Sequence, residues 1–282
     1  MTSAPTGPTA PLPLDAHVHT DQSPDSRVPI DVYAALAIEQ GLPEIAITDH
    51  VDFDRRDPAW GYVTYADRER VVREAAERWG PRGVTIRFGV EMTWNTSWAD
   101  AFRDHLGRHR YDYVIGSVHD WPGSPYRTNV GSWVAGRPLD EIVAPYYNQL
   151  MAGVRAGVFD TIGHLDVLKR YLHPFVTAAD LAARPDLLEP VLTALVESGV
   201  ALEVNTSGLY YPGHETYPSA TTVARFRELG GSRVVAGSDA HRADRLAHRF
   251  DVARRIIAEA GFEALAFRRG ELRTLIPIET PA

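Results

Sequence analysis

Residues 237–245 (GSDAHRADR) follow an apolar run, residues 232–236, that is typical of a buried strand. They place Asp239 and His241, two good metal ligands, one residue apart directly after that strand. Residues 15–20 (DAHVHT) show a similar arrangement after another apolar run near the start of the chain. If both stretches belong to one site, the fold must bring the two ends of the sequence together.

Apolar segments typical of strands recur between these ends and alternate with helix-like segments. The predicted strands are residues 12–17, 44–48, 84–90, 111–118, 159–163, 200–204 and 233–237. The predicted helices are residues 29–41, 65–80, 138–157, 184–199, 219–231 and 242–261, and a short amphipathic segment, 262–270, follows them. This alternation without a long linker favours one closed or nearly closed parallel α/β barrel, with a doubly wound sheet as the alternative.

The length and composition are those of an ordinary globular protein. The chain has 282 residues, of which 44% are hydrophobic and 23% charged, enough for a sizeable core. We expect residues 1–12 to form a flexible tail and residues 13–282 to form a single barrel domain. No apolar run approaches the roughly 18 residues that a membrane span needs, and the start lacks the features of a signal peptide. The sequence therefore predicts a cytoplasmic protein without a membrane partner.

The amino-acid content also limits the chemistry. The chain contains no cysteine, which excludes disulfides, thiolate ligands and a cysteine nucleophile, so any metal must be held by histidine and carboxylate groups. The formal net charge of -8 disfavours a general nucleic-acid binder, which usually carries a basic face.

Side chains that commonly bind metals follow nearly every predicted strand, at the end where α/β barrels carry their active sites. A single histidine there is more often a core or capping residue, but agreement among so many strand ends favours one shared metal site. Glu91 adds to this, because an unpaired carboxylate at the end of an apolar strand would be costly. The residues concerned are His17, His19, Asp49, His50, Glu91, His119, His164, Asn205, Asp239 and His241.

So many ligands exceed what one ion accepts while leaving room for water. Two or three ions bridged by carboxylates fit better. Several ions a few ångströms apart suit phosphoryl chemistry, because they make hydroxide near neutral pH and neutralise phosphate oxygens.

The order H-x-H, T-D-H, a glutamate after the third strand, S-V-H, G-H and S-D-A-H resembles the PHP (polymerase and histidinol phosphatase) superfamily. Residues 163–171 (GHLDVLKRY), 203–209 (EVNTSGL), 217–219 (YPS) and 237–242 (GSDAHR) are more narrowly similar to its histidinol-phosphate phosphatase branch. The resemblance covers nearly the whole chain after the tail. It implies a distorted seven-stranded (β/α)7 TIM-like barrel with a trinuclear metal site at the carboxyl ends of the strands.

The resemblance also implies a role for each ligand. The first ion would be held by His17, His19, Glu91 and Asp239. Glu91 would bridge to a second ion held by His119 and His164, and the third ion would be held by Asp25, His50 and His241. Some relatives have histidine at the position of Asp25, and an aspartate there favours iron or manganese as readily as zinc. Asp49 and Asp15 are expected to support the ligands, Asp15 by orienting an imidazole.

Contacts to phosphate and substrate are expected from residues beside the ligands. Arginine suits the role because its planar fork meets phosphate oxygens in a bidentate manner. The candidates for substrate binding are Lys169, Arg170, Asn205, Ser207 and Arg242, and those for catalysis are His241, Asp239, Arg170 and Arg242. Aromatic side chains that could wall an imidazole-bearing substrate are Trp94, Trp121, Tyr210 and Tyr211.

The implied activity is that of a metal-dependent phosphomonoesterase that hydrolyses L-histidinol phosphate to L-histidinol and phosphate in histidine biosynthesis. It would use two or three Zn, Fe or Mn ions and act as a monomer or small homo-oligomer. The alternatives are a phosphodiesterase or nuclease on the same scaffold, a phosphatase of another small phosphate ester, and a non-catalytic metal-bound domain. Either His241 or a bound water could protonate the leaving alkoxide.

Overall fold

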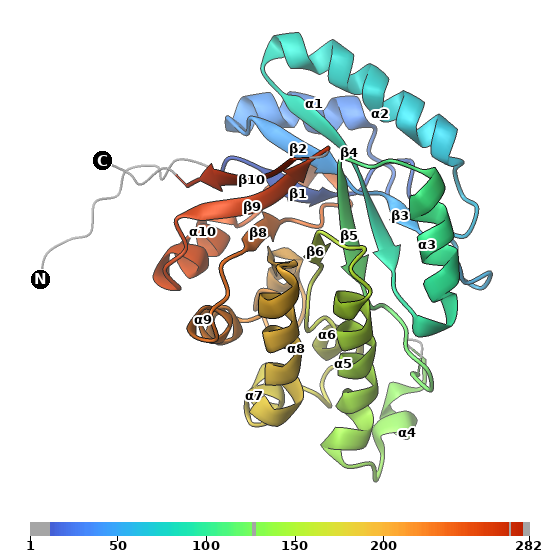
Figure 1. The fold of residues 1–282 in the computed structure, drawn as a ribbon, viewed down its shortest axis with the longest axis vertical. Helices are drawn as coiled ribbons and strands as arrows, with labels where there is room; N and C mark the ends of the chain where they lie inside the picture. Colours follow the sequence, from blue (N-terminus) through green and yellow to red (C-terminus); the bar gives the residue numbers. More distant parts are fainter. Residues whose placement is uncertain (1–11, 126–127, 271, 279–282) are drawn as a thin grey trace, which may run out of the picture.

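The computed structural model describes residues 12–125, 128–270 and 272–278. Seven parallel strands form its barrel in the order β1-β2-β4-β5-β6-β7-β8 (Figure 1). They are β1 (Asp15–Val18), β2 (Glu44–Ile47), β4 (Thr85–Thr93), β5 (Tyr113–Ser117), β6 (Thr161–Ile162), β7 (Ala201–Asn205) and β8 (Val234–Gly237). Each overlaps one predicted strand, so the predicted parallel barrel is confirmed. Nearly all of the predicted tail, residues 1–11, lies outside the described residues.

The barrel closes where β8 meets β1. Val18 pairs with Ala240 in a parallel bridge. The backbone N–H of His19 donates to the Ala240 carbonyl at 2.9 Å, and the Ala240 N–H donates to the His17 carbonyl at 3.4 Å. Residues 15–20 and 237–245, the two stretches with candidate metal ligands near opposite ends of the chain, are therefore direct neighbours.

The second strand of the barrel is interrupted. β2 pairs with residues 85–88 of β4, and β3 (His50–Val51) pairs with the same strand three residues further along, opposite Glu91 and Met92. Thr48 and Asp49 lie between the two strand segments. This interruption brings His50 directly beside Glu91 at the carboxyl end of the barrel.

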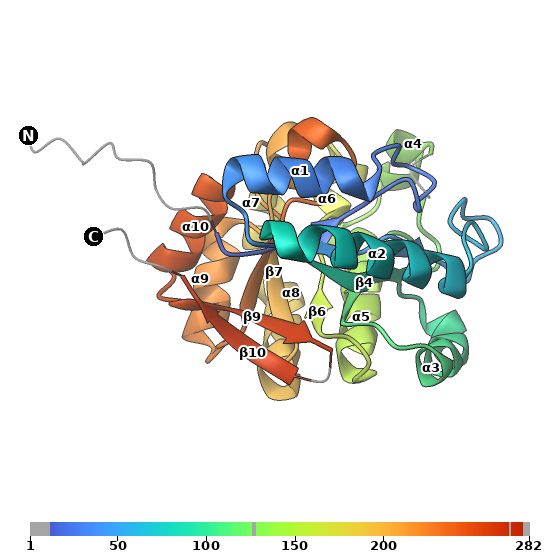
Figure 2. The ribbon, with the colours of Figure 1, turned by 90° about the horizontal axis from the view of Figure 1, so that it is seen from above.

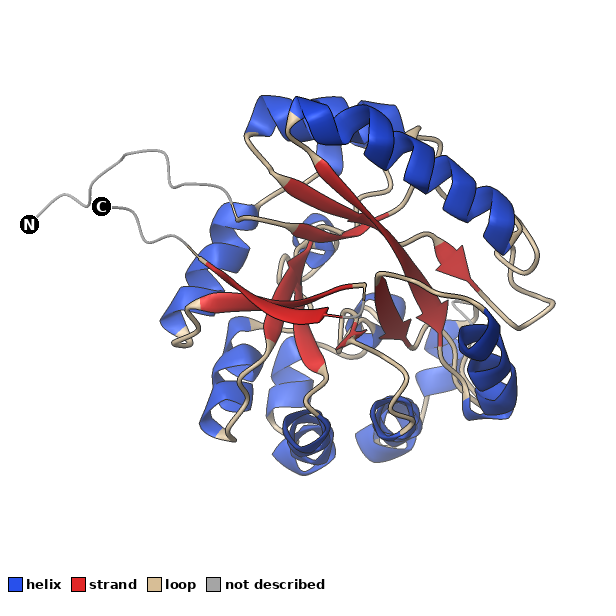
Figure 3. Ribbon diagram, turned by 45° about the horizontal axis from the view of Figure 1, so that its top comes forward, coloured by secondary structure: helices blue, strands red, loops and turns tan. Residues whose placement is uncertain are grey.

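Helices form the outer layer (Figures 2 and 3). The six predicted helices correspond to α1 (Ile30–Gln40), α2 (Tyr65–Trp79), α5 (Leu139–Arg155), α8 (Pro185–Ser198), α9 (Ala220–Glu228) and α10 (Phe250–Glu259). The Thr64 side chain accepts a hydrogen bond from the Asp67 N–H and caps α2, and Gly41 ends α1 with a φ of 66°. Four further helices were not predicted, namely α3 (Ala99–Arg108), α4 (Val130–Val134), α6 (Leu168–Tyr171) and α7 (Ala178–Ala182). None of the described helices combines the length and apolar character needed to cross a membrane.

Two segments after the last barrel strand differ from the prediction. The helix expected from residue 242 begins only at Phe250, after a short 3-10 turn, Ala243–Arg245. Ala247 and Arg249 have φ values of 49° and 56°, which no right-handed helix accommodates. The amphipathic segment 262–270 contains strand β9 (Ala264–Arg269), which pairs antiparallel with β10 (Leu272–Pro277).

The β9–β10 hairpin lies against the amino ends of the barrel strands. Phe267 is buried on Tyr113, the first residue of β5, with 4.3 Å between ring centres. Arg269 pairs with Glu44, the first residue of β2. The hairpin therefore covers the end of the barrel opposite to the carboxyl ends of the strands, where the metal ligands gather.

Candidate metal centre

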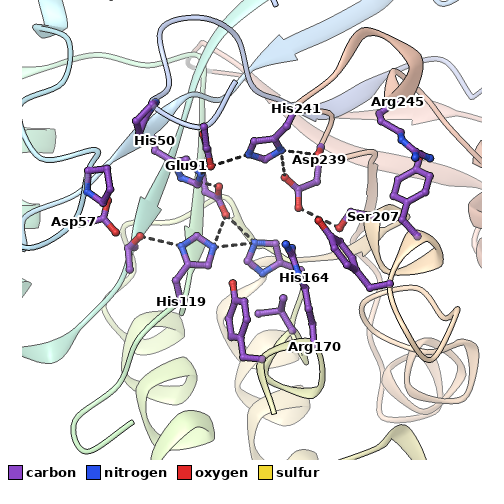
Figure 4. A pocket seen from close by; sticks show the side chains of 18 of the residues that line it. His50, Asp57, Glu91, His119, His164, Arg170, Ser207, Asp239, His241 and Arg245 are labelled. Atoms are coloured by element: carbon purple, nitrogen blue, oxygen red, sulfur yellow. Dashed lines mark hydrogen bonds and ion pairs between the residues drawn. The ribbon is translucent and has the colours of Figure 1, made fainter. Parts of the chain in front are cut away.

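All nine predicted ligands converge at the carboxyl ends of the strands. Seven of them line the cavity in Figure 4, while His17 and His19 are buried beside it. They fall into overlapping groups in which every ligand atom lies within 4.8 Å of the others. The groups are His19 with Asp25, His50 and His241; His17 with His164 and Asp239; His17 with His19 and Glu91; and His50 with Glu91 and His119.

Glu91 occupies the centre of the cluster and is almost fully buried. Its two oxygens face different imidazoles. Oε2 lies 3.3 Å from Nε2 of His17, 3.3 Å from Nε2 of His19 and 3.1 Å from Nδ1 of His50. Oε1 lies 2.8 Å from Nε2 of His164 and 3.4 Å from Nε2 of His119. A carboxylate whose oxygens face separate sets of nitrogen ligands is suited to bridge two cations.

The remaining carboxylates serve the outer part of the cluster. Asp25 Oδ2 lies 3.3 Å from His50 Nε2 and 3.1 Å from His241 Nε2. Asp239 Oδ1 lies 3.4 Å from His19 Nε2 and 3.7 Å from His17 Nε2. The three ligand sets expected from the sequence are thus each brought together, while the assignment of each set to its own ion stays a prediction.

Hydrogen bonds fix the orientation of several rings so that Nε2 faces the cluster. Nδ1 of His17 lies 2.7 Å from a Glu203 oxygen, and Nδ1 of His241 lies 2.9 Å from the Asp239 carbonyl. Because these oxygens can only accept, each Nδ1 carries the proton, and in the neutral ring Nε2 holds a lone pair. Nε2 of His17 and Nε2 of His19 are only 3.0 Å apart. A histidine and carboxylate donor set of this kind fits divalent Zn, Fe or Mn.

The pKa values describe the cluster without a cation. Burial opposes the charge of Glu91, but the neighbouring imidazoles, His17 first, hold its pKa well below the usual range. Burial likewise opposes the charge of His50, but Glu91 and Asp25 raise its pKa to about 9. His119 behaves differently, because burial lowers its pKa to about 4. The carboxylates are therefore ionised at neutral pH, and a cation that binds must displace the proton of His50.

Buried polar groups hold the loops that carry the ligands. Asp49 accepts hydrogen bonds from the Thr20 N–H at 2.6 Å and hydroxyl at 2.8 Å, which fixes the loop after β1. Arg68, 2% exposed, donates to the carbonyls of Asp49 and His50. Asp15 was expected to orient an imidazole. Its carboxylate instead accepts from backbone N–H groups and the Ser238 hydroxyl, so it joins β1 to the loop after β8.

Glu203 is the most informative residue that was not predicted. It lies inside β7, fully buried, where Oε1 accepts from His17 Nδ1 at 2.7 Å and Oε2 accepts from the His164 N–H at 2.7 Å. A methyl group at Gly237 would collide with this carboxylate and lie 2.6 Å from the His17 Cβ, so this position needs glycine. The signal in the sequence was a charged residue between Leu202 and Val204 in an otherwise apolar strand.

A cavity of about 910 Å³ opens above the ligands. Among the residues predicted to contact substrate, Arg170, Ser207 and Arg242 line it. Tyr210 and Tyr211, from the loop after β7, form part of its wall. The Ser207 hydroxyl lies 3.2 Å from Asp239 Oδ2.

Lys169 and Asn205, also predicted to contact substrate, lie outside the cavity lining. The Lys169 ammonium is buried 2.9 Å from Asp166, because successive helical residues point about 100° apart and Arg170 takes the cavity side. Asn205 donates to Glu203 and accepts from Ser207. Trp94 and Trp121 are 3% exposed and pack in the core, so they do not wall the cavity.

We expect His119→Ala and His164→Ala each to remove the same metal ion. Their Nε2 atoms lie 3.2 Å apart and both approach the same oxygen of Glu91. Because one ion cannot be lost twice, the two defects in turnover should not multiply in the double variant. Metal analysis and kinetics of the three variants check this, and multiplied defects would show that the histidines serve different ions.

Comparison with known proteins agrees with this geometry. A protein of Deinococcus radiodurans named "Probable histidinol-phosphatase" is 29% identical over 92% of this chain and 98% of its own length. A protein of the same name from Thermotoga maritima is 27% identical over 93% of this chain and 98% of its own length. The crystal structure of histidinol phosphate phosphatase from Lactococcus lactis, in complex with zinc, L-histidinol and phosphate, has a TM-score of 0.77 at 26% identity and covers 93% of this chain and 98% of that one. The family model named PHP domain matches residues 15–207, and the chain therefore belongs to the PHP domain family.

Proposed function

We propose that this protein is a metal-dependent phosphomonoesterase that hydrolyses L-histidinol phosphate to L-histidinol and phosphate, a step of histidine biosynthesis. The observation that carries the proposal is a cluster of nine histidine and carboxylate ligands, seven of which line one cavity that also has arginines on its wall. The Lactococcus lactis protein, similar over nearly the whole chain, binds zinc, L-histidinol and phosphate. Divalent ions held by the nine ligands would supply hydroxide near neutral pH and neutralise the phosphate oxygens.

The chain's own residues would bind and orient the ester for hydrolysis. In that reaction a water oxygen bonds to phosphorus, the bond from phosphorus to the ester oxygen breaks, and the leaving alkoxide takes a proton. Arg170, on α6 after β6, would hold the phosphate over the ligands. His241 has both ring nitrogens engaged, Nδ1 with the Asp239 carbonyl and Nε2 with Asp25, which favours a ligand role over that of the acid. Asp239 serves the reaction in the same way, as a ligand.

The test is phosphate release from L-histidinol phosphate by the zinc-, iron- or manganese-loaded protein, compared with hydrolysis of bis(p-nitrophenyl) phosphate. We expect a much higher kcat/KM for the monoester. Preference for the diester would support the phosphodiesterase alternative, and full metal content without activity on either ester would support a non-catalytic domain. The cytoplasmic location, the monomer or small-oligomer state and the lack of a nucleic-acid partner stay predictions from the sequence.

Arg170→Lys should keep its metal content and lose about tenfold or more in kcat/KM, roughly 1.4 kcal/mol of transition-state stabilisation. Lysine retains the positive charge and loses only the planar fork, so the change isolates bidentate geometry. Stopped assays of phosphate release with metal analysis of the same samples measure both quantities. Wild-type kinetics in this variant would mean that the phosphate is held without Arg170.

A further inference from the structure

Two arginines on the cavity wall are each stacked on one of two adjacent tyrosines. The Cζ atom of Arg170 lies 3.6 Å from the centre of the Tyr211 ring, and that of Arg245 lies 3.5 Å from the centre of the Tyr210 ring. All four side chains line the cavity above the metal ligands. Figure 4 shows Arg170 near His164 and Arg245 beyond Ser207, along the same cavity. The arginines come from different segments, Arg170 from α6 after β6 and Arg245 from the 3-10 turn after β8, and the tyrosine pair after β7 brings them to one wall.

Stacking prepares a guanidinium group for binding an anion. The ring covers one face of the group and restricts its rotation, while the N–H groups at its edge stay in the plane and keep their fork geometry. The Arg245 side chain is 31% exposed, and its contact with Asp244 is long, with 3.7 Å between Nε and Oδ2. Arg245 is therefore half-buried on the cavity wall, and its ion pair with Asp244 is too long for a hydrogen bond.

Arg242, the residue predicted for this side of the cavity, is placed differently. Its side chain is 73% exposed, and it holds Asp244 through Nε at 2.9 Å and through Nη2 at 3.4 Å. Arg242 thus neutralises the carboxylate that would otherwise compete for Arg245. Both arginines line the cavity, but Arg242 is the more exposed of the two and is engaged with Asp244, which leaves Arg245 as the half-buried cation on this side.

We propose that Arg245 is a second phosphate-binding residue of this site, acting with Arg170, and that Tyr210 holds it in position. The proposal rests on the proposed phosphomonoesterase function and gives a reason why this site would bind phosphomonoesters in preference to diesters. A phosphomonoester carries close to two negative charges at neutral pH, whereas a diester carries one. A pair of preorganised arginines therefore favours a terminal phosphate over a diester linkage.

The test measures inorganic phosphate binding to the zinc-loaded protein by calorimetry, which needs no turnover, together with kcat/KM for L-histidinol phosphate. Arg245→Gln should keep its zinc, bind inorganic phosphate about tenfold more weakly or worse, and lose a similar factor in kcat/KM. Arg245→Lys should restore part of the lost phosphate binding. Tyr210→Leu should weaken phosphate binding even though Arg245 is still present. Arg249→Gln, which removes a charge four residues away that pairs with Asp251, is the matched control and should bind phosphate normally.

Phosphate binding and turnover together separate the two proposals. If Arg245→Gln binds phosphate more weakly but the wild-type protein does not hydrolyse L-histidinol phosphate, the anion site is supported and the proposed substrate is overturned. Wild-type phosphate binding in Arg245→Gln, in a protein that does hydrolyse it, would overturn the role of Arg245 alone. An equal loss in Arg249→Gln would also overturn it, because the effect would then come from overall charge.

Discussion

Glu91→Gln should abolish phosphate release and remove more than one metal ion per chain. Glu91 is buried, and each of its oxygens faces a different set of imidazoles, with His164 at 2.8 Å from one and His50 at 3.1 Å from the other. Glutamine has nearly the same shape but lacks the charge and offers only one oxygen, so it cannot bridge two cations. We expect kcat/KM to fall by about a thousandfold or more, roughly 4 kcal/mol of transition-state stabilisation.

Metal analysis after gel filtration and kinetics on the same sample measure both effects. Asp112→Asn is a matched control, because it neutralises another buried carboxylate, at the amino end of β5, where Asp112 pairs with Arg73. That variant should lose stability and keep its metals. Full metal occupancy in Glu91→Gln would show that Glu91 does not bridge.

The parallel barrel could be predicted because its strands are buried and apolar, and because each ends where polar ligands begin. The hairpin β9–β10 could not, since a short amphipathic segment suits helix and strand alike. The start of α10 was placed too early for a tertiary reason. Asp15 binds the Ala247 N–H at 3.0 Å, a contact across almost the whole sequence that no local pattern reveals.

The site divides in the same way. Ligands such as His119 lie directly after strands, so their position along the chain indicates their position in space. Residues that reach the site from a helix, a turn or the middle of a strand give no such signal. Arg245 was predicted to lie within a helix, but in the structure it belongs to a 3-10 turn before that helix begins. Which of Lys169 and Arg170 faces the cavity depends on the rotational phase of the four-residue helix α6. Glu203 was missed because it points into the barrel from the middle of a strand.

Glu203→Gln should weaken zinc binding by about 10- to 100-fold and lower activity in step with metal loss. Glu203 accepts from His17 Nδ1 through one oxygen, and from the His164 N–H and the Asn205 amide through the other. Glutamine fails in either orientation. If its oxygen faces His17, its NH2 group meets two donors; if its NH2 group faces His17, Nδ1 must accept, which moves the ring proton to Nε2, the atom that faces the cluster.

Competition with a zinc chelator measures the affinity, and thermal unfolding of the metal-free protein shows whether the fold alone has weakened. Asp166→Asn is the control, since it neutralises a buried carboxylate that pairs with Lys169 outside the cavity lining. If Glu203 has only a structural role, both variants should lower the unfolding temperature and neither should change the zinc affinity. A positioning role predicts that zinc affinity falls in Glu203→Gln only. Wild-type zinc affinity in that variant would mean that His17 keeps its orientation without the carboxylate.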